Sequence, residues 1–168
     1  MLLQFLFKQI HCVIFSIFIL SATVNSANAK ESNQQVPNSQ IALEQALNEQ
    51  RGKVVYLDFW ASWCGPCRKS FPWMNKIQVQ YQQQGFTVIS INLDANKSLA
   101  EKFLIETPAN FAVIYDPKGK IARHFKIQGM PSSLLIGRDG QVKSSHSGFF
   151  TKKIPQYQQE IEQLLIAK

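Results

Sequence analysis

The apolar positions of the chain fall into segments whose spacing predicts strands and helices in alternation. Residues 53–60 and 86–93 are almost continuously apolar, which is typical of strands that are covered on both faces. Residues 111–115 form a shorter run of the same kind. Residues 41–50 and 67–84 instead carry apolar side chains at helical spacing, so each predicts an amphipathic helix. We expect residues 53–60 to be a central strand of the sheet.

Three further segments have helical spacing: 98–105, 121–127 and 154–165. Residues 133–136 and 141–145 flank Asp139-Gly140, a dipeptide typical of tight hairpin turns. Strands that alternate with helices, followed by a hairpin and a closing helix, predict a single α/β domain. We therefore expect a central mixed sheet flanked by helices over residues 41–168.

The first 29 residues differ from the rest of the chain and are typical of an export signal. They contain no Asp or Glu, and residues 12–20 are apolar except for Ser16. Ala27-Asn28-Ala29 supplies the small residues of a cleavage site. We predict a signal peptide over residues 1–29, with an uncleaved N-terminal membrane anchor as the alternative. The polar residues 30–40 predict a linker, and the domain is expected in the periplasm or another extracytoplasmic compartment.

Composition indicates one globular domain. A chain of 168 residues with 45% hydrophobic residues can bury a core, which excludes a disordered protein. The net charge of +7 is scattered and forms no dense basic run, so nucleic-acid binding has little support. Of the three cysteines, Cys12 lies in the predicted signal peptide, which leaves Cys64 and Cys67. His124 and His146 have no partner residues near them in the sequence, so we expect solvated or capping histidines.

Cys64 and Cys67 stand where the first long strand gives way to a helix, in the sequence WCGPC. The N-terminus of a helix has unpaired N–H groups and a partial positive charge, which stabilise a thiolate and lower the pKa of Cys64. The two-residue spacing lets the thiols meet, so Cys64 could attack a partner disulfide and Cys67 could resolve the product. Three other interpretations stay open: half of a zinc site, a structural disulfide and a pair of inert buried thiols.

Asp58 is the acidic residue of an otherwise apolar strand. Burial of a carboxylate is costly, and it should raise the pKa of Asp58 toward neutrality. Such a group is suited to proton transfer. The alternative is an Asp at the edge of the sheet that reaches water.

The segment 58–67, DFWASWCGPC, resembles the active site of thioredoxin, and the chain is similar in particular to the TlpA/ResA group of extracytoplasmic thioredoxin-like proteins. The similarity covers roughly residues 40–165. It includes Pro72, where thioredoxin-like helices carry a kinking proline, and residues 129–132, GMPS, which match the cis-proline loop of the family. Residues 95–118 resemble the helix and strand inserted in this group. The resemblance implies a thioredoxin fold with that insertion.

The resemblance also implies a role for each matching residue. Cys64 would be the nucleophile, Cys67 the resolving thiol and Asp58 the buried acid that exchanges a proton with Cys67. Four residues match positions that support the active site: Trp60, Trp63, Gly65 and Pro66. Two match the loop that binds an extended substrate: Met130 and Pro131. The resemblance implies a cis Pro131, with a trans proline in a surface turn as the alternative.

Two positions depart from the family pattern. Thioredoxin has a lysine near its buried acid, and the aligned position here is Ser90. ResA-like proteins use a Glu after the second strand. The nearest acid in this chain is Asp94, which we treat as a second candidate.

We therefore expect a monomeric thiol–disulfide oxidoreductase that reduces disulfides of exported proteins, with apocytochrome c as one candidate substrate. A membrane thiol electron donor would have to regenerate the dithiol. The pair Cys64–Cys67 is the redox centre, so we expect no other cofactor and no metal. Two alternatives stay open: an oxidase or isomerase with the same motif, and a non-catalytic binding or chaperone module.

Overall fold

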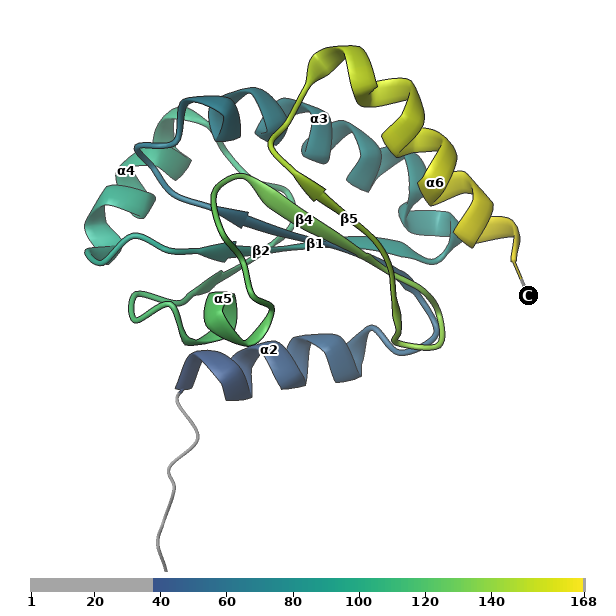
Figure 1. Cartoon of the computed structure of the whole chain (residues 1–168), viewed down its shortest axis with the longest axis horizontal. Coiled ribbons are helices and arrows are strands. Elements are labelled where there is room, and N and C mark those ends of the chain that lie inside the picture. Colours follow the sequence, from purple (N-terminus) through teal and green to yellow (C-terminus); the bar gives the residue numbers. More distant parts are fainter. Residues whose placement is uncertain (1–37, 168) are drawn as a thin grey trace, which may run out of the picture. The chain divides into compact units, whose positions relative to one another are not determined.

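A five-stranded mixed sheet forms the centre of the protein, in the order β3-β2-β1-β4-β5 (Figure 1). The computed structural model describes residues 38–167, and the predicted signal peptide at residues 1–29 lies outside this range. The strands are β1 (Val54–Trp60), β2 (Phe86–Asn92), β3 (Ala112–Tyr115), β4 (Ser132–Ile136) and β5 (Val142–Ser147). β1–β2 and β2–β3 are parallel pairs, whereas β1–β4 and β4–β5 are antiparallel. The mixed α/β sheet expected from the sequence is confirmed.

β1 is the central strand, and all of its residues are buried. Its side chains alternate between two apolar clusters, because successive residues of a strand point to opposite faces. Tyr56 and Trp60 belong to one cluster, and Leu57 and Phe59 belong to the other. The sequence therefore predicted the central strand correctly.

Helices cover both faces of the sheet. They are α2 (Asn38–Glu49), α3 (Gly65–Tyr81), α4 (Lys97–Glu106), α5 (Lys120–His124) and α6 (Ile154–Ile166), with short 3-10 turns at Gln82–Gln84 and Thr151–Lys153. Figure 1 shows α3, α4 and α6 on one face and α2 and α5 on the other. No helix within residues 38–167 is both long and apolar enough to cross a membrane.

The predicted linker extends too far into the domain. Helix α2 begins at Asn38, within the segment 30–40 that we expected to be a linker. The hydroxyl of Ser39 donates a hydrogen bond to the carboxylate of Asp116 at 3.3 Å, so the first turn is held by a residue far along the chain. A domain boundary predicted from local composition cannot take such a long-range contact into account.

Asp116 lies in a polar segment next to α5 and interacts with the start of that helix. Its buried carboxylate accepts hydrogen bonds from the N–H groups of Lys120, Ile121 and Ala122, at 2.9, 2.8 and 3.2 Å. These are unpaired donors of the first turn of α5, so Asp116 caps that helix. The helix ends earlier than the predicted segment 121–127, because Lys126 adopts a left-handed backbone with φ of 54°.

Arg138 joins three chain segments at the end of the sheet that is remote from the cysteines. Its guanidinium donates to the backbone carbonyls of Gly52, Gln84 and Leu165, at 2.8, 3.0 and 3.1 Å. Gly85, which has φ of 83°, lies directly against it: a Cβ on this glycine would lie 2.7 Å from Arg138 Nη1. A side chain at position 85 would therefore have to displace the Arg138 guanidinium from its present position.

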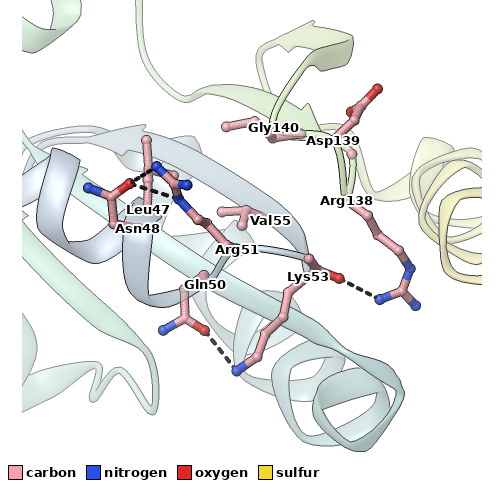
Figure 2. Close-up of a pocket in the computed structure, with 12 residues that line it drawn as sticks. Leu47, Asn48, Gln50, Arg51, Lys53, Val55, Arg138, Asp139 and Gly140 are labelled. Carbon is pink, nitrogen blue, oxygen red and sulfur yellow. Dashed lines mark hydrogen bonds between the residues drawn. The ribbon is translucent and has the colours of Figure 1, made fainter.

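A pocket of about 400 Å³ lies beside this contact (Figure 2). Two of its basic side chains are already paired with neighbours: Arg51 donates to Asn48 Oδ1, and Lys53 donates to Gln50 Oε1 at 2.9 Å. Because the pocket surrounds the first residues of β1, it lies at the opposite end of that strand from the cysteine loop. It is not part of the candidate site described below.

We expect Gly85→Ala to lower the free energy of unfolding by more than Gly140→Ala does. Both glycines have positive φ, which costs a non-glycine residue about 1–2 kcal/mol, but a Cβ at Gly140 meets nothing within 4 Å. The alanine at position 85 must also displace Arg138 from its carbonyl partners, which adds about 1–2 kcal/mol. Urea unfolding of both variants measures the difference. In an Arg138→Ala background the two substitutions should cost the same, and equal costs in the wild-type background would contradict this account.

Candidate active site at the start of helix α3

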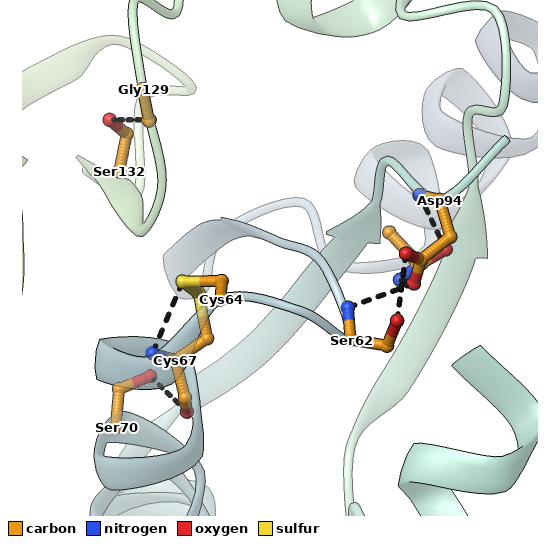
Figure 3. The surroundings of a disulfide bond; sticks show 8 residues. Ser62, Cys64, Cys67, Ser70, Asp94, Gly129 and Ser132 are labelled. Carbon is orange, nitrogen blue, oxygen red and sulfur yellow. Dashed lines mark hydrogen bonds between the residues drawn. A yellow bond between two sulfur atoms is a disulfide. The ribbon is translucent and has the colours of Figure 1, made fainter. Parts of the chain in front are cut away.

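Cys64 and Cys67 form a disulfide at the junction of β1 and α3, with an S–S distance of 2.03 Å and a Cα–Cα distance of 5.3 Å (Figure 3). Cys64 is the N-cap residue of α3, and its Sγ accepts a hydrogen bond from the N–H of Cys67 at 3.3 Å. Pro66 occupies the first turn, where its missing N–H costs no hydrogen bond. The disulfide sulfur stands in for the thiolate of the reduced protein, which the same N–H and the helix dipole would stabilise.

Exposure differs sharply within the motif. Trp63 is 71% exposed, whereas Cys64 is 4% exposed and Cys67 is fully buried. A Cβ added at Gly65 would meet nothing within 4 Å, so the outer side of the motif faces open space. A partner molecule therefore has to approach from the side of Trp63 and Gly65, where Cys64 is the more accessible of the two cysteines.

Trp60 supports this region from within the core. It is fully buried, and its ring packs against the rings of Phe71 on α3 and Phe103 on α4, both with centroids at 4.8 Å. Its indole N–H donates to Ser90 Oγ at 3.2 Å, which satisfies the polar atom that the ring carries inside. Trp60 therefore fixes α3 and α4 against the sheet, and it is not part of the exposed surface.

Asp58 lies in the middle of β1 and is 1% exposed. It shares a face of the sheet with Tyr56 and Trp60, the face that α3 covers. Its Oδ2 atom has no hydrogen-bond partner among the described residues, and burial raises the pKa of the carboxyl well above its usual value. The alternative of an edge position that reaches water is wrong, because β1 is paired on both sides.

Pro131 follows a cis peptide bond from Met130, as the resemblance implied. Ser132, the next residue, pairs with Phe59 near the end of β1, so this loop and the cysteine loop lie at the same end of the sheet. Gly148 N–H donates to Pro131 O at 2.8 Å, and Met130 packs against the apolar cluster that contains both cysteines.

Asp94 is placed differently from the catalytic acid that we considered. Its buried carboxylate accepts hydrogen bonds from the N–H and Oγ of Ser62, both at 2.9 Å, and from Asn92 Nδ2 at 2.8 Å (Figure 3). Ser62 belongs to the loop that connects β1 to Cys64. The contacts of Asp94 therefore hold the cysteine loop in place. In the sequence, the position of Asp94 just after the predicted strand at residues 86–93 was the signal that pointed to this residue.

His146 was expected to be a solvated or capping histidine, and the solvated alternative is wrong. Its side chain is 15% exposed, and its Nε2 lies 2.9 Å from Glu160 Oε2. Its ring packs on Tyr157 at a centroid distance of 4.8 Å. His124, by contrast, is exposed. Glu160 and Tyr157 lie on α6, so neither contact could be found from the sequence near His146.

No group of three or more His, Cys, Asp and Glu side chains within residues 38–167 is placed to hold a metal ion. A zinc half-site at Cys64 and Cys67 would thus lack its further ligands among these residues.

Comparison with known proteins agrees with this geometry. The sequence profile of the Redoxin family matches residues 31–161. The thiol-disulfide oxidoreductase ResA of Geobacillus kaustophilus is 32% identical over 110 residues, which is 66% of this chain and 63% of that protein. The chain thus spans slightly less than two thirds of that relative.

Solved structures show the same fold. A Chlorobium tepidum protein described as a candidate thiol:disulfide interchange protein DsbE is 50% identical, with a TM-score of 0.70 over 71% of this chain and 84% of that one. A candidate protein disulfide isomerase from Bacteroides thetaiotaomicron is 29% identical, with a TM-score of 0.65 over 72% of this chain and 79% of that one. The thioredoxin fold that the sequence predicted is confirmed, and the chain belongs to the Redoxin family, within which it is similar to the ResA and DsbE proteins.

Proposed function

We propose that this protein is an extracytoplasmic thiol–disulfide oxidoreductase that reduces disulfides of exported proteins. The observation that carries the proposal is the disulfide between Cys64, the N-cap of α3, and the buried Cys67. The names of the ResA and DsbE relatives support the same chemistry. The disulfide is itself the redox centre, so the reaction needs no further cofactor.

The proposed reaction proceeds in two exchanges. The Cys64 thiolate attacks one sulfur of a substrate disulfide, which forms a mixed disulfide and releases the other substrate sulfur as a thiolate. Asp58 then takes the proton of the Cys67 thiol, and the Cys67 thiolate attacks Cys64 Sγ. The Cys64–Cys67 bond forms, and the second substrate thiolate leaves. A thiol donor at the membrane restores the dithiol by the reverse exchange, and apocytochrome c is one candidate substrate.

The cysteine variants separate this proposal from a non-catalytic binding or chaperone module. We expect Cys64→Ser to abolish turnover of a disulfide substrate, because the remaining Cys67 is fully buried. Cys67→Ser should accumulate mixed disulfides on Cys64, because the resolving thiol is missing. Turnover assays and mass spectrometry of trapped adducts measure the two effects. Binding or holdase activity that survives in Cys64→Ser, with no turnover in the wild type, would favour the module instead.

The reduction potential of the cysteine pair tests the direction of electron flow. We expect the Cys64–Cys67 pair to have a reduction potential below that of glutathione, as a reductant requires. Equilibration with glutathione buffers of graded ratio gives this potential. A more oxidising value would favour the alternative of an oxidase or isomerase.

Asp58→Asn tests the proton role. We expect the resolving step to slow roughly 100-fold near neutral pH, at the lower end of typical contributions from a general acid or base. Stopped-flow kinetics of mixed-disulfide breakdown measures this step separately from the attack by Cys64. The matched control is Asp116→Asn, which removes a buried carboxylate that caps α5 and should leave the exchange rate unchanged. Equal rates in Asp58→Asn and the wild type would refute the proton role.

The same substitution should also change how the free energy of unfolding depends on pH. Because burial raises the pKa of Asp58 in the folded state, the folded protein holds a proton that the unfolded chain has released above its ordinary Asp pKa. The free energy of unfolding of the wild type therefore falls between the ordinary pKa and the raised one. We expect Asp58→Asn to gain more stability relative to the wild type at pH 8 than at pH 4. Urea unfolding across this range measures the difference, and a pH-independent difference would contradict it.

A further inference from the structure

A row of polar side chains crosses the sheet beneath α3 and α6. Ser90 of β2, Asp58 of β1, Ser133 of β4 and His146 of β5 are successive register partners. Partners directly opposite one another point to the same face of a sheet, and their Cβ atoms are about 5 Å apart. Ser90, Asp58 and Ser133 are buried within a face that is otherwise largely apolar. Burial of polar groups in an apolar environment costs free energy unless they form hydrogen bonds, so their presence here needs an explanation.

Two atoms of this row are buried and have no hydrogen-bond partner among the described residues: Asp58 Oδ2 and His146 Nδ1. Ser133 lies between them in the register. Its Oγ accepts a hydrogen bond from the hydroxyl of Tyr56 at 2.7 Å. A hydroxyl can accept and donate at once, so the hydrogen of Ser133 is available to an acceptor on either side.

The outer end of the row reaches solvent at His146 and Glu160. His146 Nε2 lies 2.9 Å from Glu160 Oε2, and these side chains are 15% and 24% exposed. Ser144 Oγ also donates to Glu160 Oε2, at 2.8 Å, and holds the carboxylate in place. With Nε2–H directed at Glu160, Nδ1 of a neutral His146 is a free proton acceptor that faces the protein interior.

Helix α6 supplies the titratable groups that contact His146: Glu160, at 2.9 Å from Nε2, and Tyr157, whose ring packs on the imidazole. The register partner of His146 on β4 is the uncharged Ser133, and Tyr56 and Asp58 lie one strand further away, on β1. Burial raises the pKa of Tyr56 well above its usual value, and the nearby Asp58, Tyr157 and Glu160 add to the shift. The Tyr56 hydroxyl therefore stays protonated and donates its hydrogen bond to Ser133.

The proposed exchange reaction creates a need for such a row. Cys67 is fully buried and Asp58 is 1% exposed, so a proton that Asp58 takes from Cys67 has no direct route to water at either group. The same problem arises in reverse, when the disulfide is reduced and Cys67 must regain a proton. The row of polar side chains offers a route that runs laterally across the sheet, under the helices.

We propose that Asp58, Ser133 and His146 form a proton path that connects the buried acid to solvent at Glu160, an inference that rests on the proposed function. Protonated Asp58 passes its proton through the Ser133 hydroxyl to His146 Nδ1. The imidazolium that forms is paired with the Glu160 carboxylate and releases its Nε2 proton to water. No electrons move in this transfer, and the sulfur exchange proceeds as described above. His146 acts through Asp58 and does not touch the sulfur atoms.

The kinetic test uses His146→Ala, with His124→Ala as the matched control on an exposed histidine. We expect steady-state turnover of His146→Ala to fall roughly 100-fold in dilute buffer near neutral pH, at the lower end of typical contributions from an acid–base group. The rate of the first attack by Cys64 should not change. Added imidazole should restore turnover in His146→Ala, because it can carry protons in the vacated space, and should not affect His124→Ala. Turnover and a pH profile equal to the wild type, or a loss that imidazole does not restore, would overturn the proposal.

A second test does not depend on activity. In the oxidised protein with 13C-labelled aspartate, the pH dependence of the Asp58 side-chain carbon reports on the groups coupled to this acid. We expect that curve to change in His146→Gln and to match the wild type in His124→Gln. An Asp58 titration that is identical in the wild type and in His146→Gln would overturn the path even if the protein folds normally.

The two tests also separate this inference from the proposed function. If the wild type exchanges disulfides and the His146 variants match it in both measurements, the path is wrong and the proposed function stands. If neither the wild type nor Cys64→Ser exchanges disulfides, the proposed function and the path through it both fail.

Discussion

Strand β1 is buried along its whole length and hydrogen-bonded on both sides, and the arrangement of the functional groups depends on it. A strand in this position cannot shift its register, because a shift by one residue would exchange its two apolar faces. Its alternation directs Asp58 toward the face that α3 covers. Its end at Trp60 leads after a short loop to Cys64, the cap of α3. One strand therefore positions both Asp58 and the cysteine pair with which Asp58 is proposed to exchange a proton.

The loop between β1 and α3 is held from a neighbouring strand. Asp94 follows β2, which runs parallel to β1, so the ends of the two strands lie at the same edge of the sheet. Its three hydrogen bonds to Ser62 and Asn92 fix the approach to Cys64. The exposed Trp63 and the open space beside Gly65 leave the outer side of this fixed loop accessible. The site thus combines a buried, hydrogen-bonded interior with an outer side that is open to a partner disulfide.

The buried acid in the interior of the site lowers the stability of the fold. Asp58 carries a buried oxygen without a hydrogen bond, and its burial opposes the charged form. A fold selected for stability alone would favour an apolar residue there. Polar side chains on the strands to either side, Ser90 and Ser133, give the acid neighbours that can relay hydrogen bonds without adding charge. The row ends at His146, where the sheet reaches α6 and water.

Four features could be predicted from the amino-acid sequence: the order of strands and helices, the central place of β1, the cysteine pair at the start of a helix, and the unusual acid Asp58 in an apolar strand. These features are encoded locally, in the period of apolar residues and in a motif of a few positions. Contacts between distant polar residues are visible only in the folded chain: Ser39 with Asp116, Ser62 with Asp94, and His146 with Glu160. The same is true of the row in which Ser133 and His146 follow Asp58 across the sheet. Strand register and helix docking set these contacts, and both are properties of the packed chain that no local pattern of residues contains.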